Sequence, residues 1–480
     1  MIDLNHLEKY TENNRIEAKK ALGGLPRSIW ETYSAFANTL GGIILLGVEE
    51  YKDKTLHTVD LPDPEGLVKE FWETINNPSK ASVNLLSSKQ VRIETVNRDH
   101  IIVIEVPRAH RCDQPVFVDN NPKSGTYRRD GEGDHHCTAE ELQAMYRDAS
   151  IYTQDMTVLE NMDNSVFCME SVQRYRQCME CSHPHHIWKN LDNPSFLLQL
   201  GAICIGADDQ THPTAAGLLM FGYEQEILRE YPDYYLDYHE EPIDASQSAE
   251  HFVSSSGDWS GNVFDFFTHV SSKLAHSLDT QLKAQDTPIH KGACEALANC
   301  LINADYYERA GLVIVKKNDQ ITMSNPGDFR IELDAARSGG MSDPRNSILM
   351  KMFSLINVSE QTGSGIPNIL YIWKQQGWSK PAILQAFAPN RVTLFLPLTN
   401  KSELSDEPEC SAASTQMNAS AIQGMIIAYL TDHAKASCAE LAELLDLNPV
   451  RVSMVLQKMI AAGIIAAQGE PSNYAYKLKA

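Results

Sequence analysis

The sequence predicts a multidomain chain of mixed α/β and α+β domains, and three observations lead to this prediction. Its 480 residues exceed what one hydrophobic core normally organises, so three or more domains are expected. Two long blocks alternate helical runs with short β-branched runs, and a polar stretch rich in Ser, Glu and Ala follows them. The predicted units are an N-terminal domain at 1–148, a helical connector at 149–212, a central domain at 213–399, a flexible linker at 400–419 and a winged helix-turn-helix at 420–480.

The first block has the pattern of one α/β domain. Residues 30–40 follow a helical period, and the pair Gly41 and Gly42 ends this run before an apolar strand at 43–48. Two β-branched runs, at 91–96 and 101–106, are separated by three polar residues and predict a hairpin. Thr138 and Glu141 form a capping-box pattern that predicts the start of a helix.

The second block predicts a compact α/β domain, and the tail predicts a winged helix-turn-helix. The central landmarks are a helix across 290–302 and strands at 312–316, 321–324 and 391–398. The tail contains three short helical runs, at 422–432, 438–445 and 448–462. Residues 463–478 then alternate weakly around a Gly-Glu-Pro turn, as the strands of a wing do.

Composition excludes several function classes. The formal net charge of −22 argues against nonspecific coating of DNA, because neutralising phosphates requires a basic protein. The ten cysteines lack the regular spacing of a secreted disulfide scaffold and indicate reduced thiols. The N-terminal residues are polar and acidic rather than signal-like, and the apolar runs are too short to cross a bilayer. We expect a cytoplasmic protein without a membrane span.

Acidic residues stand at the ends of predicted neighbouring strands in the N-terminal domain. Glu12 and Glu17 flank the start of a first strand, and Glu49 and Glu50 end the strand at 43–48. Lys19 lies two residues beyond Glu17 and therefore on the same strand face. Carboxylates that converge in this way can bind Mg²⁺ and support displacement at a phosphate, although glutamates at strand ends are more often solvated.

A wider pattern connects these carboxylates to a known family. The run Ala35-Phe36-Ala37-Asn38-Thr39-Leu40-Gly41-Gly42, with Glu12, Glu17 and later Arg128 and Arg129, resembles the AlbA-like (AlbA_2) domain of the Schlafen family. The resemblance covers about the first 145 residues. It implies a nucleic-acid-binding fold and, in the nucleases of the family, an RNA-cleaving site with Mg²⁺ or Mn²⁺. Carried over, that site is Glu12, Glu17 and Glu50, with Glu49 as a close substitute, where the family usually has Asp in the third position. Lys19, Arg128 and Arg129 are the candidate phosphate contacts.

The central helix carries three polar side chains at i, i+4 spacing, namely Glu295, Asn299 and Asn303, which places them on one face. This helix, together with the Asn325-Pro326-Gly327 and Gly363-Ser364-Gly365 segments, resembles a GHKL-type ATPase domain over residues 195–398. The resemblance implies an α/β sandwich that binds ATP. Glu295 would position the attacking water, Asn299 would ligate Mg²⁺, and Gly327, Gly363 and Gly365 would let the backbone approach the nucleotide. The usual adenine-binding Asp is absent at Asn325, and Asp305 and Asp328 are alternative stand-ins.

Two further patterns are weaker. Cys178, Cys181, His183, His185 and His186 have zinc-like spacing, but no second Cys-x-x-Cys pair accompanies them and an ordinary connector is the stronger interpretation. In the tail, Arg451 and Lys458 lie on the recognition-like third helix as candidate nucleic-acid contacts. The tail balances five basic against five acidic residues, so it is as suited to protein contacts as to DNA.

Three hypotheses for function follow. The leading hypothesis is an ATP-regulated protein that binds DNA or RNA, for example as a transcriptional regulator. The second is a Schlafen-like metal-dependent endoribonuclease that cuts tRNA or another structured RNA in defence against phage. The third is an assembly protein that forms homo-oligomers. Hydrolysis of ATP by the central domain stays an open alternative, with a weak ATPase activity as the expected form.

Overall fold

The computed structural model describes residues 2–131, 133–241, 250–282, 288–358, 363–387, 390–399, 435–437, 465–468 and 475–478, with five single residues in the tail (426, 430, 441, 456 and 459). The chain folds into two compact units, Met1–Ser405 and Asp406–Ala480. The predicted mixed α/β multidomain architecture is confirmed. In the described part of the chain, no helix has both the length and the apolar character of a membrane span.

The N-terminal module, from η1 to α4, is built on a four-stranded sheet in the order β1-β2-β6-β5. Strands β1 and β2 pair in parallel and the other pairs are antiparallel. Its elements are η1 (Leu4–Lys9), β1 (Ile16–Lys19), α1 (Ile29–Ala37), β2 (Gly42–Leu46), β3 (Val48–Glu50), β4 (Leu56–Thr58), α2 (Pro64–Ile75), β5 (Val91–Val96), β6 (Asp99–Val106), η2 (Arg111–Asp113), α3 (Pro122–Gly125), β7 (Tyr127–Asp130), β8 (Gly133–His136) and α4 (Ala139–Ala149).

Both faces of this sheet are covered, as the apolar run in β2 requires. Ile44 and Leu46 of β2 pack with Phe36 of helix α1, whereas Leu45 between them packs with Leu7 of η1 on the other face. Side chains of a strand alternate between its two faces, so a strand covered on both sides is apolar throughout. The capping box predicted at Thr138 is present at the start of α4.

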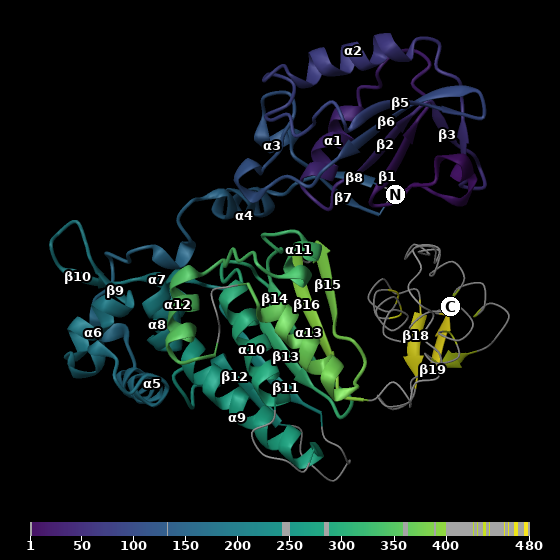
Figure 1. Ribbon diagram of the computed structural model, residues 1–480. Helices are drawn as coiled ribbons and strands as arrows, with labels where there is room; N and C mark the ends of the chain where they lie inside the picture. Colours follow the sequence, from purple (N-terminus) through teal and green to yellow (C-terminus); the bar gives the residue numbers. More distant parts are fainter. Residues whose placement is uncertain are drawn as a thin grey trace. The chain divides into compact units, whose positions relative to one another are not determined.

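The central module is built on a six-stranded mixed sheet in the order β12-β11-β13-β14-β16-β15. Helices α9, α10 and α13 lie side by side along it, with α10 between the other two and against β14 (Figure 1). The elements that form this layer pair are β11 (Leu236–Glu240), β12 (Glu250–Val253), η6 (Ser254–Ser256), α9 (Val263–Leu282), α10 (Pro288–Asn303), β13 (Leu312–Lys316), β14 (Gln320–Pro326), α11 (Leu333–Ser338), α12 (Ser347–Leu355), α13 (Gly365–Gln376), β15 (Ala382–Phe387) and β16 (Asn390–Pro397).

The predicted connector is part of the same packed body. One hydrophobic cluster extends from Leu159 to Leu398, so the helices before β11 share their core with the six-stranded sheet. These preceding elements are η3 (Gln154–Met156), η4 (Asn164–Val166), α5 (Met169–Ser182), η5 (Ile187–Asn190), α6 (Asn193–Leu200), β9 (Ile203–Ile205), β10 (Thr211–Pro213), α7 (Ala215–Phe221) and α8 (Glu224–Glu230).

The C-terminal unit contains a three-stranded antiparallel sheet in the order β17-β19-β18. Its strands are β17 (Ala436–Ser437), β18 (Ile465–Gln468) and β19 (Ala475–Leu478). Strands β18 and β19 pair within the segment predicted to form a wing. The linker at 400–419 and most of the three predicted helices lie outside the described residues.

Candidate functional site

The N-terminal carboxylates lie on or beside the strands where the sequence places them, but each has its own partner. Glu12 precedes β1 and accepts the backbone N–H of Ala18 at 3.0 Å. Glu17, on β1, is buried and contacts Lys19 Nζ at 2.7 Å and Arg129 Nη2 at 2.7 Å. On β3, Glu50 contacts Lys54 at 3.2 Å and Glu49 contacts Lys20 at 2.5 Å.

Glu12 is partly buried beside two other carboxylates. Burial raises the pKa of Glu12, and the nearby carboxylates of Glu17 and Glu50 raise it further. One oxygen of Glu50, Oε1, is buried without a hydrogen-bond partner. Among the described residues, however, no three His, Cys, Asp or Glu side chains are arranged to hold one metal ion. In this conformation Glu17 is bound by two cations, Lys19 and Arg129.

The candidate phosphate contacts Arg128 and Arg129 differ from the prediction, because both are buried. Arg129 is 3% exposed and lies between Glu17 and Asp134, with distances of 2.7 Å and 2.9 Å. Arg128 is 6% exposed and contacts Asp328 of the central module at 2.8 Å. Lys19 is similarly turned to Glu17. In this conformation all three cations form ion pairs with carboxylates of the chain.

A cavity of about 150 Å³ lies between α10, α13 and the sheet of the central module. Its apolar side chains come from strands and helices on all sides, and the polar lining includes Asn299, Asn303 and Asn325. Gly363 and Gly365 also line it. Burial raises the pKa of the lining thiol Cys300 to about 12, so this cysteine is protonated at neutral pH. The cavity combines an apolar interior with a few convergent polar groups, as small-molecule sites do.

The first turn of α13 packs directly on the polar face of α10. A Cβ added to Gly365 would lie 2.7 Å from Asn299 Nδ2 and 3.3 Å from Glu295 Oε1, so only glycine permits this approach. Asn368, one turn further along α13, donates to Glu295 Oε2 at 2.6 Å. The sequence patterns did not single out Asn368; its only signal is its position three residues after Gly365.

The predicted adenine-binding residues separate into two groups. Asn325 lines the cavity, where it accepts from Cys300 Sγ at 3.4 Å and donates to the carbonyl of Pro326 at 3.2 Å. Asp328 also lines it but is paired with Arg128. Asp305 and Gly327 are not among the lining residues. Asp305 is buried against Arg147 at 2.9 Å, and a Cβ on Gly327 would lie 2.9 Å from the guanidinium of Arg345.

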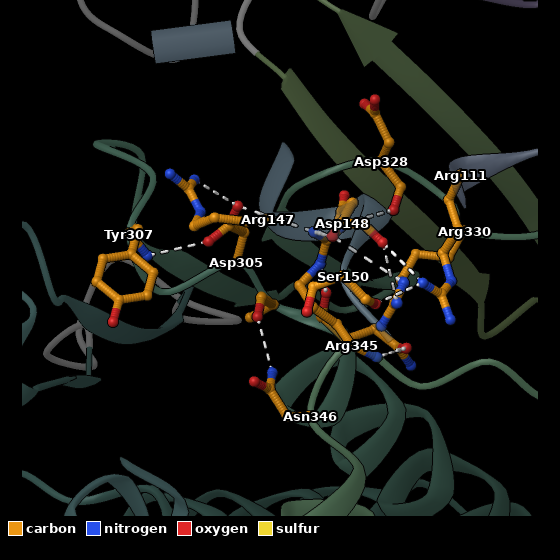
Figure 2. Close-up of polar contacts among 12 residues, drawn as sticks. Arg111, Arg147, Asp148, Ser150, Asp305, Tyr307, Asp328, Arg330, Arg345 and Asn346 are labelled. Atoms are coloured by element: carbon orange, nitrogen blue, oxygen red, sulfur yellow. Dashed lines mark hydrogen bonds and ion pairs between the residues drawn. The ribbon is translucent and has the colours of Figure 1, made fainter. Parts of the chain in front are cut away.

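Beside the cavity, arginines and aspartates of the two modules form a buried junction (Figure 2). Arg345 is 2% exposed and is bonded to Asp148 at the end of α4, and its Nε donates to the carbonyl of Asn303 at 3.1 Å. Arg111 of η2 contacts Asp343 at 2.5 Å. Burial opposes the charge on Arg345, but the carboxylates of Asp148 and Asp305 raise its pKa and keep it protonated.

The remaining candidates do not form sites in the described structure. Cys178 and Cys181 lie on α5, and the residues described around them contain no three-ligand group for zinc. Arg451 and Lys458 lie outside the described residues.

Separate family models match the N-terminal module and the central module. Residues 12–138 match the family model "Schlafen, AlbA_2", and residues 313–394 match "Putative ATP-dependent DNA helicase recG C-terminal". The chain contains a Schlafen-type AlbA_2 domain and a RecG C-terminal-like domain. Between them, residues 143–237 match a domain of unknown function, DUF8451. The AlbA_2 match ends just before the α4 helix that carries Asp148.

Two solved structures are similar to the chain. A crystal structure of a protein from Corynebacterium diphtheriae has 12% identity and a TM-score of 0.40, covering 97% of this chain and 95% of that one. A solution structure of the N-terminal domain of a RecG-related protein from Nitrosomonas europaea has 30% identity and a TM-score of 0.22, covering 28% of this chain and 90% of that one. No curated protein matched the chain.

Proposed function

We propose that this chain is a nucleotide-regulated nucleic-acid-binding protein, in which the central cavity binds ATP and the AlbA_2 domain contacts DNA or RNA. The observation that carries the proposal is the cavity, where Asn299 of α10 meets the glycine turn at Gly363 and Gly365 beside an apolar interior. The family matches at 12–138 and 313–394 support the nucleic-acid part.

The chemical types of the residues around the cavity match the parts of a nucleotide. The apolar lining suits a base, Asn325 offers a polar group to its edge, and the N–H groups near Gly363 and Gly365 suit phosphate oxygens. Asn299 would hold the Mg²⁺ that accompanies ATP and Glu295 would orient a water molecule, and bound ATP would supply the phosphoanhydride bond that hydrolysis breaks. The cavity is smaller than the roughly 300–1,000 Å³ of typical ligand sites. Side chains must therefore move, or the phosphates must extend beyond the cavity.

The test measures nucleotide and nucleic-acid binding on the same protein. Titration calorimetry with Mg²⁺ and ATP is compared for the wild type, Asn299→Ala and Gly365→Ala. We expect micromolar to millimolar binding by the wild type and at least a tenfold loss, about 1.4 kcal/mol, in both variants. Gly23→Ala is the matched control, because an added Cβ there meets nothing within 4 Å. Equal affinity in all four proteins would exclude the cavity as the site.

Gel shifts with labelled tRNA, single-stranded RNA and double-stranded DNA, with and without ATP, test the second half of the proposal. A shift whose midpoint changes with ATP is the expected result. A protein that shifts none of the three probes at about 50 mM salt, where phosphate contacts are strong, would contradict nucleic-acid binding.

A Schlafen-like nuclease is the alternative, and the position of Glu12 beside the carboxylates of Glu17 and Glu50 favours it, because a divalent cation binds where carboxylates gather. The ion pairs of Glu17 count against it. Incubation of the same tRNA and RNA probes with Mg²⁺ or Mn²⁺ decides the question. Cleavage by the wild type that is absent in Glu17→Gln and unchanged in Glu94→Gln would establish the nuclease. Homo-oligomer formation stays a separate prediction, which light scattering across concentrations tests.

A further inference from the structure

The rim of the cavity, defined here as Asp328, Phe329, Arg330, Asp343, Pro344 and Arg345, is formed by two segments that follow β14 and precede α12. Five of these six residues contact the N-terminal module. Arg128 contacts Asp328 at 2.8 Å, Arg108 donates to the carbonyl of Phe329 at 2.7 Å, and Arg111 contacts Asp343 at 2.5 Å. Asp148 of α4 binds both Arg330 and Arg345.

Most of these contacts are buried and hold the rim in one arrangement, whereas the side chains of the Arg111–Asp343 pair are 24% and 27% exposed. Arg345 and Arg330 have side chains that are 2% and 5% exposed, and Arg128 has one that is 7% exposed. Within the rim, Arg330 also donates to the carbonyl of Pro344 at 2.8 Å, which ties the two segments together. Separating the modules would leave several buried charges without partners. We therefore expect the rim to lose its order when the N-terminal module leaves it.

We infer that docking of the N-terminal module onto the rim completes the cavity, so that occupancy of the cavity and docking are thermodynamically coupled. A ligand binds more tightly when the rim is already ordered, because its binding free energy is not reduced by the entropy cost of ordering those residues. Linkage is reciprocal: if docking raises affinity for the ligand, the ligand stabilises docking by the same factor. The AlbA_2 domain is thus coupled to the cavity through the rim contacts of Arg108, Arg111 and Arg128, none of which lines the cavity.

This inference rests on the proposed function, since the probe is a nucleotide. Calorimetry of the full chain with Mg²⁺ and a non-hydrolysable ATP analogue is carried out on the wild type, Arg108→Gln and Arg111→Gln. Both variants should bind the analogue roughly 5- to 20-fold more weakly. Arg92→Gln is the matched control: Arg92 belongs to the same domain and pairs only with Glu94 and Glu105 among the carboxylates described.

Hydrogen exchange on the wild type provides a readout that needs no variant. Saturating analogue should slow amide exchange severalfold in the peptide that covers η2 (Arg111–Asp113) and leave β5 (Val91–Val96) unchanged. Binding that is equal in all variants, with no change at η2, would overturn the coupling and leave the proposed function intact. Absence of binding by the wild type would overturn both, and calorimetry alone distinguishes these two failures.

Discussion

Two charged regions of the chain use the same residue types in opposite ways. At the junction, Arg345 has Asp148 and Asp305 beside it, and burial of the guanidinium is matched by carboxylates that raise its pKa. Around Glu12 the neighbours are Glu17 and Glu50, so burial and like charge act in the same direction and raise the pKa of a carboxylate. The junction is an interface in which charge is compensated. In the acidic cluster Glu17 and Glu50 have cationic partners, whereas Glu12 accepts a backbone N–H and has a raised pKa, a perturbation that is frequent at functional sites.

The largest expected effect comes from breaking the compensated region. Arg345→Leu leaves Asp148 and Asp305 buried without this partner, and we expect a loss of about 3–5 kcal/mol in the free energy of unfolding, measured with urea. Arg92→Leu, which removes only exposed ion pairs, should cost no more than about 1 kcal/mol. Similar losses in the two variants would show that the junction is not specially compensated.

The next largest effect concerns Glu17, the member of the acidic cluster that most resembles the junction. Glu17→Gln removes the charge between Lys19 and Arg129, and Arg129 retains Asp134. A charged hydrogen bond to a buried group contributes about 1.5–3 kcal/mol, so a loss of that order is expected in urea unfolding. A loss as small as that of the exposed control Glu94→Gln would contradict the geometry described for Glu17.

The third prediction tests the acidic cluster through the pH dependence of stability at Glu12. Because its pKa is raised in the folded state, the folded protein holds this proton more tightly than the unfolded chain does. The contribution of Glu12 to the free energy of unfolding of the wild type is therefore fully present below the ordinary glutamate pKa of about 4.3. It is lost as pH rises through the pKa that Glu12 has in the folded protein. Glu12→Gln does not titrate, so its stability relative to the wild type should rise between about pH 4 and pH 7. A difference that is constant across this range would contradict the raised pKa.

The smallest effect is expected for the exposed pair Lys20–Glu49, whose side chains are 52% and 33% exposed. Lys20→Ala should change the unfolding free energy by about 0.5 kcal/mol or less, and about 0.5 M salt should abolish the difference. A loss above about 1 kcal/mol in the free energy of unfolding would contradict this expectation, because exposed ion pairs contribute less than that.

Local patterns predicted much of the fold because they act over a few residues. The strand at 312–316 was predicted to the residue, and the capping box at Thr138 lies where the sequence places it. The junction could not be predicted, since Arg345 and Asp148 are 197 residues apart and nothing in either segment indicates the other. For the same reason the sequence predicts Arg128 as a phosphate contact and gives no sign of its partner Asp328, which lies 200 residues away. Asn299, Gly363 and Gly365 line one cavity, whereas Gly327 packs on Arg345.

The order of strands in the two sheets has a consequence for synthesis of the chain on the ribosome. The first sheet is complete when β6 ends at residue 106, but β16, which lies between β14 and β15, ends only at residue 397. At about 5–20 residues per second, roughly 15–60 s separate these two events. From residue 128 onward Arg108, Arg111 and Arg128 have all been made, while the six-stranded sheet that positions Asp328 is still incomplete. Until that sheet is finished, these arginines lack the contacts with Phe329, Asp343 and Asp328 that they make in the folded protein.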